Sequence, residues 1–456
     1  MQKNTNNNKN KNNIKNNNFL KGIFSLIGCL IHSFVNSIFY SFSYLTIYLL
    51  SYLKTFNDNI HIRNYYIFSP IVTIFYGISS PFAGIFNKKI GITKTLFLGN
   101  FLMILPSYLI YLSENIYFDY FYFIFYGIGI GLSQRITIHN SVQYFPNCKG
   151  LISSLYSTFC GIGIIFLNFY VENFIINPKH FEPNVENNTF YSGEINYNFK
   201  QFLKLQIFCY LILTLLTFVF IFPFENEKNF DENENENENE NLYVQMEKDD
   251  ENEYDINDIK MALKSKRFLK ILIIFFNTIF FVTLIENTYR PIAILKKIDT
   301  KTQQNIISLV FILICILTLI FGILFDKFSF KIIMNLINFI ICFSCFFYNF
   351  SDYSNITFVF WCLSISFGNA GIYSILYPHI MKIFGIKYYL ELSGIVSLMD
   401  SLSSPFVSAF VYSMDFFFEN NRNFGYFLVY FFCGILNIIS IYFTCYENEI
   451  EFEYKK

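Results

Sequence analysis

Long apolar runs alternate with short polar turns along this chain. A helix needs about 20 apolar residues to cross the hydrocarbon core of a bilayer, because its backbone polar groups must be satisfied within the span. Twelve runs fit this length, and they cover residues 22–50, 65–86, 92–113, 118–143, 150–173, 202–224, 268–289, 305–324, 330–350, 355–380, 390–414 and 424–446. The pattern therefore predicts an all-α membrane protein with twelve transmembrane helices.

An acidic low-complexity stretch separates the sixth run from the seventh. Its Asn and Glu repeats cannot bury enough apolar surface to fold, so we expect a flexible linker. The chain then divides into two six-helix bundles. The predicted segments are a disordered tail at 1–21, a bundle at 22–224, the linker at 225–266, a bundle at 267–446 and a second tail at 447–456.

The composition supports a membrane protein. Hydrophobic residues make up 54% of the chain and charged residues only 15%, which is too apolar for a soluble domain. The net charge of -1 gives no electrostatic footprint for nucleic acid. We expect a multi-pass protein in the lipid bilayer of the plasma membrane or of an organelle, with no metal and no cofactor. A monomer is compatible with the sequence.

The basic residues predict the orientation. No apolar segment precedes the first span, so the Asn- and Lys-rich N-terminal tail is expected to remain in the cytoplasm. With an even number of spans, the C-terminus lies on the same side. Lys and Arg residues concentrate in the turns of that side, as the positive-inside rule requires.

Two charged turns occupy equivalent places in the two halves. "GIFNKKIGITK" (Gly84–Lys94) joins the second and third spans, and "GILFDKFSFK" (Gly322–Lys331) joins the eighth and ninth. A repeat between halves indicates a transporter built from two related bundles that rock around a central solute. The candidate gating residues in these turns are Gly84, Asn87, Lys88, Gly91, Lys94, Gly322, Asp326, Lys327 and Lys331.

These turns resemble the signature of the major facilitator superfamily, G-x-x-x-D-[RK]-x-G-x-[RK]-[RK]. Asn87 replaces the acidic residue in the first copy, and the second copy is looser. In physical terms, a basic cluster at a helix end can bond the last carbonyls and face anionic groups of a neighbouring span. Such contacts would close the cytoplasmic side of a transporter. The simpler alternative is that the lysines only anchor the topology.

Two further stretches resemble the monocarboxylate transporter and oxalate-formate antiporter group. They run from Tyr126 to Gly163 and from Phe384 to Phe406. The resemblance implies a secondary transporter of small organic anions. One departure affects the expected substrate. In the oxalate-formate group a lysine in the eleventh span helps to hold the anion, whereas Asp400 occupies the corresponding position in this chain.

Ionisable residues inside a span are costly, so each is a candidate for the transport site. Arg135 lies within the fourth span and shares a helix face with His139, which predicts a cation and an imidazole beside a cavity. The alternative for Arg135 is snorkelling, in which its long stem reaches the headgroups. Asp400 lies near the centre of the eleventh span, beside four serines. It is a candidate for binding or proton coupling, or else a residue that these serines satisfy.

The remaining candidates are less specific. Glu286 and Arg290 are spaced i, i+4 near the non-cytoplasmic end of the seventh span, where they are expected to form a salt bridge or an outer gate. Tyr40 occupies a position of the first span that often faces the cavity in the superfamily. For His379, at the end of the tenth span, we expect an interfacial position.

Together these features favour a secondary transporter of a small, monocarboxylate-like solute, with protons as a second candidate partner. Transport of another solute, such as an amino acid or a sugar, is the main alternative. A membrane sensor on the same scaffold is another. The sequence contains no zinc-protease motif, nucleophile elbow or P-loop, so we do not expect an enzyme.

The predicted orientation can be tested by mapping which segments are accessible from each side of the membrane. We expect the linker and both termini to be labelled from the cytoplasmic side, because the basic turns hold the intervening loops there. A tag placed within residues 225–255 should therefore react only after the membrane is permeabilised. Labelling of that tag in sealed cells would contradict the orientation.

Overall fold

The computed structural model describes residues 2–57, 60, 65–179, 193–224, 256–296, 298, 300–349, 354–418 and 421–446. The first half contains α1 (Gln2–Lys54), α2 (Tyr65–Ser79), α3 (Phe82–Ile90), α4 (Ile92–Leu112), α5 (Ile116–Tyr144), α6 (Lys149–Ile165) and α7 (Gly193–Phe220). The second contains α9 (Ile256–Lys264), α10 (Lys266–Leu295), α11 (Thr300–Lys327), α12 (Phe330–Phe346), α13 (Asn355–Phe384), α14 (Tyr389–Phe417) and α15 (Arg422–Cys445). Short 3₁₀ and π-helical turns lie at Pro146–Cys148 and Phe166–Ile176.

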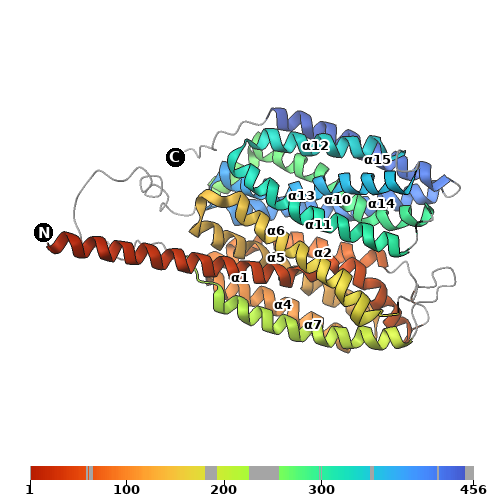
Figure 1. Cartoon of the computed structure of the whole chain (residues 1–456), viewed down its shortest axis with the longest axis horizontal. Helices are drawn as coiled ribbons and strands as arrows, with labels where there is room; N and C mark the ends of the chain where they lie inside the picture. The colour runs from red at the N-terminus through yellow and green to blue at the C-terminus, as the bar shows by residue number, and fades with distance from the viewer. Residues whose placement is uncertain are drawn as a thin grey trace.

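The helices form two bundles that lie side by side. In Figure 1 the helices of the first half occupy the lower part of the molecule and those of the second half the upper part. In the described residues, ten helices are long and apolar enough to span a membrane. The α2–α3 pair and the 17-residue α12 supply the other two spans. The predicted fold of two six-helix bundles is confirmed.

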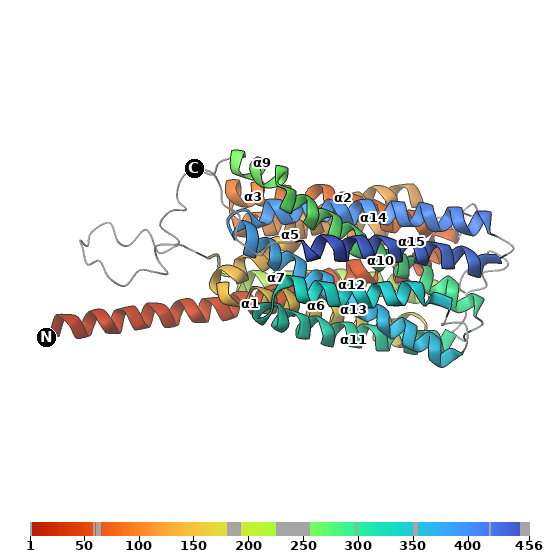
Figure 2. The same ribbon diagram turned by 90° about the horizontal axis from the view of Figure 1, so that it is seen from above.

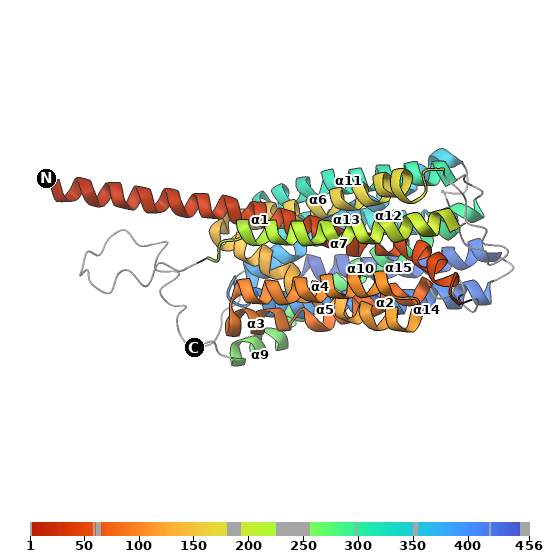
Figure 3. The same cartoon turned by 90° about the horizontal axis from the view of Figure 1, so that it is seen from below.

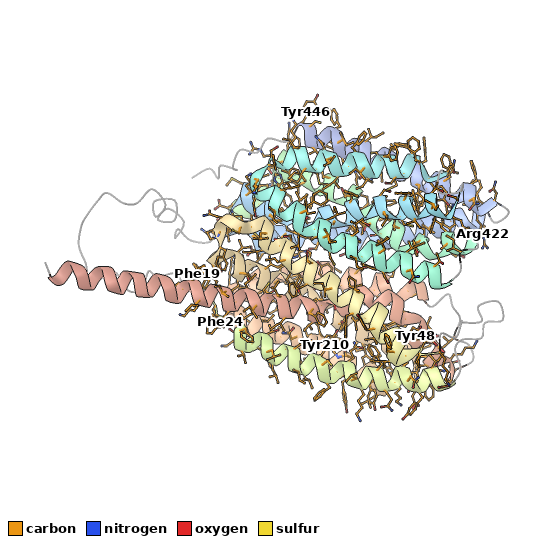
Figure 4. The ribbon with its side chains drawn as sticks, in the orientation of Figure 1. Phe19, Phe24, Tyr48, Tyr210, Arg422 and Tyr446 are labelled. Carbon is orange, nitrogen blue, oxygen red and sulfur yellow. The ribbon has the colours of Figure 1, made fainter. Side chains whose placement is uncertain are left out.

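The start of α1 and the end of α15 lie at one end of the long axis, called here the terminal end (Figure 1). Phe19 and Tyr446 lie toward it, and Tyr48 and Arg422 lie toward the opposite end (Figure 4). The outer surface carries many exposed aromatic and aliphatic side chains, among them Phe97 and Phe339. Such a surface suits lipid rather than water, because lipid tails impose no penalty on exposed apolar groups.

Several elements differ from the expected boundaries. The second span is broken at Ser80 and Pro81, where proline cannot donate the next helical hydrogen bond, so α3 begins a new turn. The helix α1 starts at Gln2 and thus includes the expected tail, since no glycine or proline interrupts it before Gly22. The end of the expected linker forms α9, and residues 225–255 lie outside the described residues.

The two bundles meet mainly along α2 with α14 and α6 with α11, and α6 also contacts α13 while α3 and α5 contact α14. Small residues allow both close approaches. A Cβ on Gly394 of α14 would lie 2.5 Å from the Pro81 backbone, and one on Gly150 of α6 would lie 2.5 Å from the Gly322 carbonyl oxygen of α11. These distances are too short for any larger side chain, so the glycines determine how closely the bundles pack.

The helix α9 lies at the terminal end beside α3, as Figure 2 and Figure 3 show from opposite sides. It also contacts α10 and the start of α14. Ala262 is its buried anchor, and the Tyr388 hydroxyl donates a 2.7 Å hydrogen bond to the Asp258 carboxylate. The last part of the linker is therefore docked on the second bundle.

Candidate functional site

A cavity of about 100 Å³ lies between the bundles. It is lined by side chains from α5 and α6 of the first bundle and from α11 and α13 of the second. The lining residues are Gln134, Arg135, Ile138, Ser153, Tyr156, Ser157, Cys160, Gly161, Ile164, Phe311, Ile314, Thr318, Asn369, Tyr373 and Tyr377. Arg135 carries the only formal charge among these lining residues.

Arg135 is held by phenols from both bundles. Its side chain is 2% exposed. The Nη2 atom donates to the Tyr76 hydroxyl oxygen at 2.9 Å and to the Tyr377 hydroxyl oxygen at 2.7 Å, and the guanidinium lies 4.1 Å from the centre of the Tyr377 ring. The snorkelling alternative does not fit these contacts, because the charge is buried inside the protein. Within the described structure the buried Nε–H of Arg135 has no hydrogen-bond partner.

Asp400 of α14 is a counter-charge for Arg135. It interacts electrostatically with Arg135, although the described structure contains no direct ion pair between the two side chains. The neighbouring serines do not cage its carboxylate. Ser403 donates to the Asp400 backbone oxygen, and Ser401 donates to that of Ser397, so these hydroxyls satisfy the helix instead.

The structure separates His139 from the cavity. Its Nε2–H donates to the Ile386 carbonyl at 3.3 Å, and its ring stacks on Tyr389 at 6.0 Å. These partners belong to the other bundle, so His139 contributes to the contact between bundles rather than to the cavity wall. His379 is fully buried and stacks on Phe330 at 3.6 Å, and α13 continues past Pro378 to Phe384. Its expected position at the membrane interface stays a prediction.

The first charged turn forms an ion pair between the two bundles at the terminal end. Lys88 Nζ lies 2.6 Å from Glu391 Oε1 in the first turn of α14. Partial burial lowers the pKa of Lys88, and the hydrogen bond that Lys88 donates to the Glu391 carboxylate opposes this effect. Gly84 makes room for the contact, since its Cβ would lie 2.6 Å from that carboxylate. We call this pair the first latch.

The second charged turn makes a matching contact with α6, the second latch. The Asp326 carboxylate accepts hydrogen bonds from the backbone N–H groups of Gly150 and Leu151, at 2.9 and 3.0 Å. An anion at a helix N-terminus is stabilised by the free N–H groups and by the helix dipole. Gly322 lies in the same crossing, against Ser154 and Gly150.

The other residues of the two turns have different surroundings. Gly91 has φ of 84°, a conformation that favours glycine, and it allows the chain to turn from α3 into α4. The Asn87 carbonyl accepts the Gly91 N–H at 2.9 Å. Lys94, Lys327 and Lys331 are exposed. The side chains of the candidates Tyr40, Glu286 and Arg290 lie outside the described residues.

Sequence reasoning missed Glu391, Tyr76 and Tyr377. Glu391 could have been found as an isolated carboxylate in the first turn of an apolar helix, facing a turn that has lost its own acidic residue at Asn87. The two tyrosines had no distinguishing signal, because the chain contains 34 of them. Only the three-dimensional arrangement identifies them as the partners of Arg135.

Comparisons with known proteins agree with this architecture. The sequence profile described as Major Facilitator Superfamily matches residues 3–167 and 207–408. No curated protein sequence matches the chain. The structure is similar to the E. coli fucose:proton symporter, with 13% identity, a TM-score of 0.65, and coverage of 93% of this chain and 99% of the symporter.

Two other solved structures have similar folds. The human organic anion transporter TETRAN has 9% identity and a TM-score of 0.67, over 93% of this chain and 99% of its own. A proton:xylose symporter bound to 6-bromo-6-deoxy-D-glucose has 15% identity and a TM-score of 0.59, over 94% of this chain and 95% of its own. At such low identities these likenesses show the fold and not the substrate.

The first latch predicts a local effect of Lys88→Ala. The Glu391 side chain is only 6% exposed, so loss of its cation leaves a carboxylate that must reach water, and the α3–α14 contact should loosen. Hydrogen exchange at residues 389–393 should become faster, by about tenfold for a loss near 1.4 kcal/mol. Lys94→Ala is the matched control, because Lys94 is an exposed lysine of the same turn. Equal protection in both variants would show that the ion pair does not hold the bundles together.

Proposed function

The chain belongs to the Major Facilitator Superfamily, and from this premise we propose that it is a secondary transporter of a small, monocarboxylate-like anion. The observation that carries the proposal is the buried guanidinium of Arg135 at the wall of the cavity between the bundles. Anion selection follows from this charge, because a carboxylate can accept hydrogen bonds from the guanidinium, whereas a cation is repelled. Arg135 would bind the carboxylate of the solute.

The donor groups around the cavity fit a carboxylate. Arg135 uses one nitrogen for Tyr76 and Tyr377, and its Nε–H is left for a ligand. A guanidinium presents its donors in a planar fork that matches two carboxylate oxygens. A cavity of about 100 Å³ suits a solute of only a few heavy atoms. These features support a small acid more than a hexose.

The latches indicate how access would alternate. Both lie at the terminal end and both join one bundle to the other, through Lys88 with Glu391 and through Asp326 with the start of α6. Opening that end requires both contacts to break, while the opposite end closes. In the proposed cycle the solute is released after the latches open, and Tyr377 is withdrawn from Arg135 as the bundles rock.

Asp400 supports a second candidate, a zwitterion such as an amino acid. Its carboxylate interacts electrostatically with Arg135, and paired opposite charges could bind the ammonium and carboxylate groups of one solute. We place this reading second because Asp400 is not among the residues that line the cavity. The substrates after which the similar structures are named, two sugars and an organic anion, do not select between the candidates.

Arg135→Ala should abolish uptake while the protein is still expressed and folded. Arg135→Lys should restore only part of the activity, because a point charge replaces the planar fork. A hydrogen bond to a charged group contributes about 1.5–3 kcal/mol, so the lysine variant should show KM raised about tenfold or more. Uptake is measured in proteoliposomes with labelled pyruvate, lactate, oxalate, amino acids and hexoses.

The matched control is Arg422→Ala, which removes an exposed arginine at the end of the molecule opposite the terminal end (Figure 4). Arg422 does not line the cavity. Normal kinetics in Arg135→Ala would refute the role of Arg135. Uptake of hexoses but not acids by the wild type would refute the proposal that the transported solute is an anion.

Asp400→Asn tests proton coupling. The amide keeps the shape of the side chain but cannot ionise, so a coupling carboxylate predicts loss of pH-driven accumulation with retained solute exchange. A structural carboxylate predicts that both persist. A solute-binding carboxylate predicts that both are lost. Measuring counterflow and pH-driven uptake on this variant separates the three roles, and retained pH-driven accumulation would reject coupling.

A further inference from the structure

A chain of buried polar side chains crosses the first bundle and ends at the cavity. It runs from Asn100 on α4 through His32 and Asn36 on α1 to Tyr156 on α6, and each of the four is at most 2% exposed. The distances are 3.2 Å from His32 Nε2 to Asn100 Oδ1, 3.4 Å from Asn36 Nδ2 to His32 Nδ1 and 2.6 Å from Asn36 Nδ2 to the Tyr156 hydroxyl oxygen. Tyr156 lines the cavity.

The direction of these hydrogen bonds follows from the Asn36 amide. Its nitrogen can only donate, so both the Tyr156 oxygen and His32 Nδ1 are acceptors. An imidazole that accepts at Nδ1 carries its proton on Nε2, and from there it donates to Asn100 Oδ1. The whole chain therefore points the same way, with one tautomer of His32 matching both of its neighbours.

This direction has a consequence for the cavity. Because the Tyr156 oxygen accepts from Asn36, its own hydroxyl hydrogen is not used in that bond, and the described structure assigns it no other acceptor. In the reverse arrangement Asn36 would present its oxygen, Tyr156 would donate to it, and the phenol could only accept from a solute. The polarity of one amide thus decides whether Tyr156 is a donor or an acceptor toward the cavity.

We propose that His32 and Asn36 are positioning residues that fix Tyr156 as a hydrogen-bond donor to the bound solute. The inference rests on the proposed function in that the solute must offer an acceptor, as a carboxylate does. It adds a second anchor on α6, across the cavity wall from Arg135 on α5. It also gives a role to the imidazole of His32, which does not line the cavity and could act on the solute only through Asn36.

The buried chain is not explained by packing alone. Asn36 Oδ1 and Asn100 Nδ2 have no partner in the part of the chain that the structure describes, so the arrangement leaves two polar atoms unsatisfied. Unsatisfied buried polar atoms are costly, and apolar residues of similar shape would avoid that cost. The need to keep the Tyr156 hydroxyl as a hydrogen-bond donor explains why an amide and an imidazole occupy these buried positions.

Four variants of the full chain test the proposal in proteoliposomes with labelled pyruvate as the probe. Tyr156→Phe removes the donor and should raise KM about tenfold, with a smaller change in the maximal rate. His32→Leu removes the acceptor that orients Asn36 and should raise KM several-fold. His32→Asn places an oxygen near the lost Nδ1, so it should restore KM. Tyr126→Phe is the matched control. The Tyr126 hydroxyl shares a 2.6 Å hydrogen bond with the Tyr210 hydroxyl, and Tyr126 does not line this cavity.

A second measurement reads the direction of the chain without transport. The protein contains five histidines, and ¹⁵N labelling of these residues in membranes gives one imidazole spectrum per site, with the His32 signal identified by its loss in His32→Asn. We expect the tautomer protonated on Nε2 in the wild type. Detection of the tautomer protonated on Nδ1 would overturn the proposal, as would an unchanged KM in His32→Leu.

The two hypotheses fail in different ways. If the wild type takes up neither pyruvate nor the other labelled acids, the proposed function fails, and the His32 tautomer then decides this inference alone. If pyruvate uptake depends on Arg135 but Tyr156→Phe behaves like Tyr126→Phe, the proposed function stands and the inference is overturned. A KM raised in Tyr156→Phe and His32→Leu, and restored in His32→Asn, supports both.

Discussion

The charge of Arg135 must be compensated wherever the bundles move, and this requirement governs the centre of the molecule. A guanidinium in the middle of a span costs about 2.5–3.5 kcal/mol on insertion scales, and it persists only with partners. Here the partners are Tyr76 from the same bundle and Tyr377 from the other, with Asp400 at longer range. Because one phenol belongs to each bundle, this compensation depends on the present position of the bundles. Any other position needs a substitute for Tyr377.

The terminal end is held by two contacts of the same kind, each made by an anion from one bundle and hydrogen-bond donors from the other. In the second latch Asp326 keeps the acidic position of its turn and meets the N-terminus of α6. In the first, the acidic position holds Asn87, and the carboxylate is supplied by Glu391 of α14 instead. The acidic residue of this contact therefore lies in the second bundle instead of the first, and an attraction between the two bundles is retained. Glycines at 84 and 322 provide the space in both cases.

The sequence predicts the fold well because a bilayer imposes a simple rule on length and polarity. The apolar runs, the two halves and the paired turns all follow from that rule and its repeat. The bilayer rule does not predict two local features. Pro81 breaks the second span, and α9 forms from a few amphipathic residues at the end of an acidic stretch. Arg135 was accessible to the same reasoning, since an ionisable residue in a span stands out. Its phenol partners were not, because a tyrosine beside a cavity has the same sequence signature as one that faces lipid.

His139 shows the limit of helix periodicity most clearly. Its spacing from Arg135 places both on one face of α5, and the face is indeed directed at the other bundle. One turn of helix, however, moves a side chain by about 5.4 Å along the axis. Over that distance the surroundings of this helix face change. Arg135 lines the cavity, whereas His139 packs against Ile386 and Tyr389 of the other bundle. Periodicity predicts the direction in which a side chain points around a helix. Where along the helix axis the two bundles separate to form the cavity depends on how the bundles pack together.

Charge balance connects the cavity to the proposed coupling. With no solute, Arg135 and Asp400 balance each other through space. An anion that binds Arg135 brings a second negative charge into the same low-dielectric region, and its repulsion of the Asp400 carboxylate is relieved when that group takes up a proton. The loaded cavity then carries the same net charge as the empty one. Under the proposed function, an anion and a proton that enter together would therefore cross without moving net charge, and this balance is the reason to propose transport of the acid over transport of its anion alone.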